Sequence, residues 1–157
     1  CSARASGFYI LEGINMREKK LNQRDFPIAE TRPSKVKGKR GMALSELTID
    51  AVLEGTVDLE DLQITPEALL QQAEIAKSVG RKTLSENFER AAEMNNLPNS
   101  EVMEIYELLR PGRTETMSAL LEAAKKIRNE YQAEKLAKFI EEAAEFYEKR
   151  GLFKKRF

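Results

Sequence analysis

The chain has 157 residues, 26 Lys or Arg against 26 Asp or Glu, no histidine and one cysteine, Cys1. Without histidine and with a single cysteine, it cannot form Ser/His/Asp or Cys/His nucleophile sets, imidazole zinc sites or cysteine-rich metal clusters. No run approaches the roughly 20 apolar residues that span a bilayer, so we expect no membrane segment. One cysteine cannot form an intramolecular disulfide, which favours a reducing, cytoplasmic setting.

Composition divides the chain into three parts. Residues 1–15 hold only a short apolar run and precede Met16, so we interpret them as a vector-derived leader and Met16 as the natural start. Residues 16–46 are basic and poor in apolar side chains, whereas residues 47–157 are dense in Leu, Ala, Ile and Glu. We therefore expect an all-α fold of about five short helices in one compact domain, with an extended N-terminal arm.

The arm is strongly basic. Nine Lys or Arg lie between Arg17 and Arg40, against three acidic residues. Prolines and glycines interrupt it too often for a helix, and we predict that residues 21–41 become ordered only on a partner. The charge favours an arm that lies on an anionic surface such as an acidic protein neighbour, and plain solvation is the alternative. Nucleic acid is disfavoured because no aromatic side chain is interleaved with the basic cluster 35–40 for base stacking.

The strongest helix start is Thr65–Pro66–Glu67. It combines a capping hydroxyl, a proline at the first helical position and a carboxylate in the positively polarised first turn. We expect this helix to end at Gly80. Upstream, Thr48 is expected to cap a short helix that ends at Glu54, and residues 57–62 are expected to form another single turn.

Apolar residues at spacings of three and four predict four further helices. One covers residues 82–95, one covers 101–109, one begins at a cap on Thr114, and the last carries Leu136 and Ile140 on its apolar side. The apolar stripe skips a step at residues 131–133, where we expect a break, and Gly151 ends the last segment. Five aromatic side chains are expected in the core: Phe88, Tyr106, Phe139, Phe146 and Tyr147.

Two other interpretations remain open. Helix starts recur roughly every 16 to 18 residues, close to half of the 34-residue tetratricopeptide period, although the chain has no Trp and no repeated motif. A free-standing helical adaptor for other proteins is therefore an alternative. The carboxylate pairs Glu101/Glu104 and Glu141/Glu142 are of the type that serves as acid and base or holds a divalent cation, but we expect them to form a solvated helix face.

Several motifs occur in a fixed order along the chain. They are Arg24–Ala29, Leu47–Ile49, Ile64–Glu67, Asn87–Glu93, Leu108–Pro111 and Glu142–Ala144. In these segments the chain resembles the small (gamma) subunit of adenosylcobalamin-dependent diol and glycerol dehydratases. The resemblance extends from Met16 to the C-terminus.

The resemblance implies a non-catalytic, mainly helical subunit that packs on a large catalytic subunit and stabilises it. The assembly would be a dimer of heterotrimers of large (alpha), medium (beta) and small subunits. It would convert propane-1,2-diol or glycerol to an aldehyde and water, with adenosylcobalamin held between the large and medium subunits. We accordingly expect no catalytic, cofactor-binding or metal-binding residue on this chain, no nucleic-acid or membrane partner, and a cytoplasmic enzyme, either free or enclosed in a bacterial microcompartment.

Overall fold

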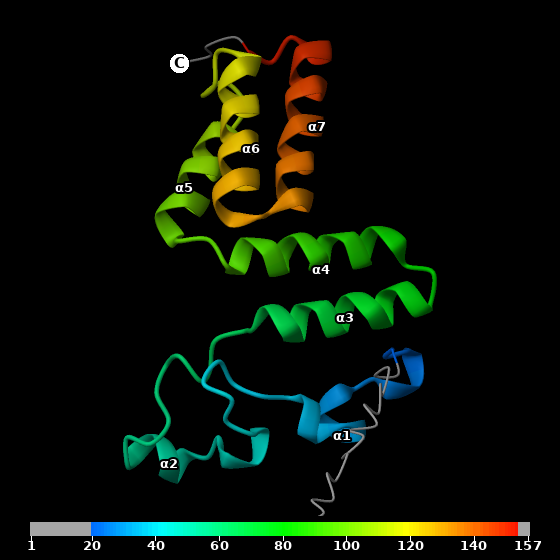
Figure 1. The fold of residues 1–157 in the computed structure, drawn as a ribbon, viewed down its shortest axis with the longest axis vertical. Helices are drawn as coiled ribbons and strands as arrows, with labels where there is room; N and C mark the ends of the chain where they lie inside the picture. Colours follow the sequence, from blue (N-terminus) through cyan, green and yellow to red (C-terminus); the bar gives the residue numbers. More distant parts are fainter. Residues whose placement is uncertain (1–19, 154–157) are drawn as a thin grey trace, which may run out of the picture.

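The structure is a computed structural model that describes residues 20–153. Two helical hairpins form its body (Figure 1). The first hairpin pairs α3 (Pro66–Ser78) with α4 (Lys82–Asn95), and the second pairs α6 (Met117–Tyr131) with α7 (Glu134–Arg150). The second hairpin stands across α4 instead of stacking beside the first as in a tetratricopeptide array, and α5 (Asn99–Leu108) connects the two (Figure 1). The predicted all-α class is confirmed.

The start of α3 follows the sequence signal. Thr65 Oγ1 accepts a hydrogen bond from the backbone N–H of Ala68 at 3.1 Å, and Pro66 occupies the first turn. The helix ends at Ser78, and Gly80 adopts a left-handed φ of 76° in the turn that leads to α4. Small side chains, including Ala73 and Ser85, are buried in this hairpin, so the two helices can pack closely along their length.

The main core lies between α5, α6 and α7. Leu120, Ile127 and Ile140 are its largest fully buried side chains. Burying each of them contributes about 1.5–3 kcal/mol. The predicted break is confirmed, because α6 ends at Tyr131 and Gln132 adopts a left-handed backbone with φ 56° before α7 begins. The remaining buried members of this core are Leu97, Ile105, Ala124, Ala133, Leu136, Ala137 and Ala144.

Three of the five aromatic residues predicted for the core are exposed instead. Each helix of the α6–α7 hairpin buries one narrow face, which is filled by Ala, Leu and Ile, and this leaves bulkier side chains on the flanks. Phe139 and Phe146 lie on α7 outside this face, and Tyr106 is exposed on α5. Phe88 is partly buried, and so is Tyr147, whose hydroxyl donates to the Leu109 carbonyl oxygen at 2.5 Å.

The predicted N-cap of α6 is also wrong, by two residues. The helix begins after Thr116, not after Thr114. Thr114 is buried, and its hydroxyl donates to the Leu108 carbonyl oxygen at 2.5 Å. It therefore closes the loop after α5, because a threonine hydroxyl satisfies a nearby backbone group as readily as it caps a helix.

The N-terminal arm is folded against α3, which corrects the expectation that residues 21–41 become ordered only on a partner. Leu21 and Ile28 are buried with Ile75 of α3, and the Leu21 N–H donates to Glu74 Oε2 at 3.0 Å. Gln71 Nε2 donates to the Lys35 carbonyl oxygen at 3.2 Å. The elements of this region are η1 (Gln23–Asp25), α1 (Ile28–Thr31), η2 (Pro33–Lys35), η3 (Leu44–Glu46) and α2 (Ile49–Leu53). As predicted, Thr48 caps α2. The predicted leader lies outside the described residues.

Candidate partner-binding surface

The carboxylates considered for acid–base chemistry are held in ion pairs. Glu141 accepts two hydrogen bonds from the Arg128 guanidinium, at 2.7 and 2.9 Å, and Arg128 Nε also donates to Glu134 at 2.7 Å. The Arg128 hydrogen bonds hold the pKa of Glu141 below its ordinary value. Glu101 accepts from Lys126 Nζ at 2.6 and 2.7 Å. A general acid at neutral pH needs a raised carboxyl pKa, so the Glu141 environment is opposite to what that chemistry requires.

The other two carboxylates form looser surface pairs. Glu104 lies 3.9 Å from Lys126 Nζ, and Glu142 lies 4.0 Å from Lys138 Nζ. Both are exposed, as expected for a solvated helix face. Across residues 20–153, no group of three or more Cys, Asp or Glu is arranged to hold a metal ion, and no helix there has the length and apolar character to cross a membrane.

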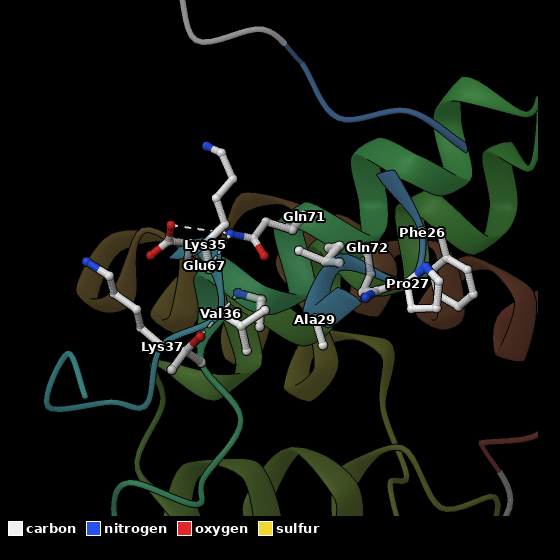
Figure 2. A pocket seen from close by; sticks show the side chains of 12 residues that line it. Phe26, Pro27, Ala29, Lys35, Val36, Lys37, Glu67, Gln71 and Gln72 are labelled. Atoms are coloured by element: carbon white, nitrogen blue, oxygen red, sulfur yellow. Dashed lines mark hydrogen bonds between the residues drawn. The ribbon is translucent and has the colours of Figure 1, made fainter. Parts of the chain in front are cut away.

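A hollow of about 240 Å³ lies between the arm and α3 (Figure 2). Phe26 and Pro27 line one side of it, and the side chain of Lys35 extends away from them (Figure 2). Gln71 donates to Glu67 Oε1 at 3.4 Å as well as to the Lys35 carbonyl oxygen. The hollow is thus a seam between the arm and α3 that the Gln71 amide bridges, because it bonds to a group on each side.

The Asn87–Glu93 motif forms the joint between α4 and α7. Glu93 accepts from the backbone N–H groups of Lys135 at 3.1 Å and Leu136 at 2.8 Å. It therefore caps α7 from another helix, because Ala133 at the N-cap position has no side-chain acceptor. One turn earlier in α4, Glu89 lies 2.7 Å from Lys135 Nζ. The Arg90 guanidinium stacks over the Phe139 ring of α7, with its Cζ 4.7 Å from the ring centroid.

The Arg24–Ala29 motif lies at the first turn of the arm. Asp25 is buried, and its Oδ2 accepts from the Asn22 backbone N–H and side-chain amide, both at 2.9 Å. Its Oδ1 lies 2.6 Å from Arg32 Nε. The carboxylate thus ties the start of the arm to the residue that follows α1. Two of the motifs that carry the family resemblance, one in the arm and one on α4, thus hold separate segments of the fold together.

The turn at residues 38–41 clamps the loop that follows α2. Arg40 donates to both carboxylate oxygens of Asp61, with Nε at 2.9 Å from Oδ1, and to the Thr56 carbonyl oxygen at 3.0 Å. Asp61 is buried, and its bond to Arg40 lowers its carboxyl pKa. A Cβ at Gly38 would lie 2.7 Å from the Asp61 carbonyl oxygen, so the contact requires glycine. Part of the anionic surface expected for the basic arm is therefore the chain's own loop.

The segment held by this clamp carries an exposed apolar surface, which we call the α2 surface. Its residues are Ile49, Val52, Leu53, Leu59, Leu62 and Ile64, each between 48 and 80% exposed. It lies at the end of the molecule opposite the α6–α7 hairpin (Figure 1). A concentration of exposed apolar side chains is typical of a surface that binds another molecule. Sequence reasoning missed it, although apolar residues at 49, 52 and 53 already share one face of a short helix.

Comparisons with known proteins identify the family of this chain. The family model for the dehydratase small subunit matches residues 21–154. The propanediol dehydratase small subunits of Citrobacter freundii and Salmonella typhimurium are each 43% identical to this chain over 130 residues, which cover 83% of this chain and 75% of each relative. The match spans almost all of the described residues, including both joints and the α2 surface. The chain belongs to the dehydratase small subunit family.

Proposed function

We propose that this chain is a non-catalytic structural subunit of a coenzyme B12-dependent dehydratase that converts propane-1,2-diol or glycerol to an aldehyde and water. The family match over residues 21–154 carries the proposal. The ion-paired carboxylates and the placement of shared motifs at the joints of the fold support it, because they indicate a role in holding shape. The partners are the large and medium subunits, in a dimer of heterotrimers in the cytoplasm.

The residues of this chain do not fit the cofactor. Its 157 residues include no histidine that could ligate cobalt. The hollow between the arm and α3 measures only about 240 Å³, which is small for a group the size of cobalamin (Figure 2). In the proposal adenosylcobalamin is therefore bound by the large and medium subunits, and the isolated chain binds no cobalamin and dehydrates no diol.

Co-expression with the large and medium subunits from the same source tests the proposal. The complex is separated by size-exclusion chromatography and assayed for diol dehydration with added adenosylcobalamin, and a matched sample omits this chain. We expect co-elution, and loss of activity or of soluble complex when the chain is omitted. A chain that elutes alone, while the other subunits are fully active without it, would overturn the proposal and favour the helical adaptor.

A further inference from the structure

The α2 surface has an unusual charge environment. Between Met42 and Ala76 the chain has eight Asp or Glu and no Lys or Arg. Three of these acidic residues, in the loop after α2, are neutralised by the clamp: Arg40 binds Asp61 and lies 3.6 Å from Asp58, and Lys39 lies 3.7 Å from Glu60.

Two carboxylates remain beside the exposed apolar side chains. Asp50 lies within α2 and Glu54 lies at its C-cap, on the same short helix as Ile49 and Leu53. In the described part of the chain, no Lys or Arg lies within 4.0 Å of either carboxylate. The α2 surface is thus an apolar area with an acidic rim that nothing in the described chain neutralises.

We propose that the α2 surface docks onto another subunit of the dehydratase, at an apolar area rimmed by Lys and Arg. The inference rests on the proposed function and adds the surface that makes the contact. An apolar centre excludes water, and opposite charges at the rim orient the partners and speed their association. An acidic rim repels anionic lipid headgroups and nucleic-acid phosphates, so it favours a basic protein surface over a membrane or a nucleic acid.

The clamp holds this surface in place before binding. Arg40 joins the turn at 38–41 to the loop that follows α2, and Gly38 lets the two backbones touch. A preformed surface loses less conformational entropy on binding than a disordered one. Arg40 is accordingly a positioning residue, which we do not expect to contact the partner itself.

A double variant, Ile49→Ser with Leu53→Ser, tests the proposal in the co-expressed complex. Both side chains are about 80% exposed, so the variant is expected to fold normally by circular dichroism. The matched control is Met103→Ser with Tyr106→Ser, because these residues are also exposed on one helix, α5, but on the other part of the molecule. We expect the α2 variant to weaken capture by the other subunits at least about tenfold and the control to bind like the wild type.

Charge reversal provides a second measurement that does not remove apolar area. Asp50→Lys with Glu54→Lys should weaken capture and remove or invert its dependence on salt. If the other subunits bind both variants as well as they bind the wild type, the proposal is overturned. It is also overturned if the wild-type chain associates with itself and the only effect of the α2 variant is to make this chain monomeric. If the wild-type chain itself fails to assemble, the proposed function fails together with this inference, and that result differs from the loss of capture in the variants alone.

Discussion

Replacing Glu93 by Ala should loosen the joint between the two hairpins. The change removes two hydrogen bonds, to the N–H groups of Lys135 and Leu136, and a negative charge at the N-terminus of α7. Loss of a capping acceptor costs about 0.5–2 kcal/mol, and loss of the charge at the helix terminus costs about 0.3–1 kcal/mol more. We therefore expect a destabilisation of about 1–3 kcal/mol. At roughly 2–4 °C per kcal/mol for a protein of this size, Tm should fall by about 2–12 °C.

Thermal unfolding followed by circular dichroism, with urea unfolding at 25 °C, measures this effect. Glu93→Gln is expected to lie between the wild type and Glu93→Ala, because its amide keeps one acceptor oxygen but no charge. The matched control is Glu142→Gln, an exposed carboxylate on α7 whose loss should change stability by less than about 0.5 kcal/mol. If Glu93→Ala melts at the same temperature as Glu142→Gln, the reasoning about the cap is wrong.

Three further changes test other parts of the fold. Leu120→Ala should lower the free energy of unfolding in urea by about 2–5 kcal/mol, because the side chain is fully buried. The control Leu121→Ala, at a side chain that is 38% exposed, should lower it by about 1 kcal/mol or less, and equal effects would contradict the assigned core. Gly38→Ala should lower stability by about 1–3 kcal/mol, since the new methyl group meets the Asp61 backbone, and an unchanged urea midpoint would refute the contact. Because the bond from Arg40 lowers the pKa of Asp61 below its ordinary 3.8, the pair stabilises the fold above that pH and loses this contribution as pH falls further. The Tm difference between wild type and Asp61→Asn should therefore be constant near neutral pH and shrink in acid, and a difference that grows in acid would reverse the sign.

Local signals in the sequence predicted where helices begin and end. The Thr65–Pro66 start, the Thr48 cap and the break at residues 131–133 each depend on side chains within a few positions of the backbone groups that they satisfy or interrupt. Thr114 shows the limit of such signals. Its hydroxyl bonds to the Leu108 carbonyl oxygen in the loop after α5, a tertiary contact that a local cap signal does not reveal.

Features that join distant segments could not be read from spacing. Glu93 caps a helix that begins about forty residues later, and a glutamate on an amphipathic helix gives no sign of such a partner. Phe139 and Phe146 sit on an apolar stripe, but the hairpin has only one side to bury. The arm was predicted to become ordered only on a partner, yet Leu21 and Ile28 are buried together with Ile75 of α3.

The cap on α7 also fixes the geometry of the molecule at a distance. α7 extends from Glu134 to Arg150, about 25 Å at 1.5 Å per residue, and its base rests on α4 (Figure 1). A tilt of α7 by about 10° at its Glu93-capped N-terminus would displace its C-terminal end by about 4 Å over that length. The Glu93 carboxylate thus contributes to the angle at which α7 leaves α4, and through the length of α7 to the position of its far end.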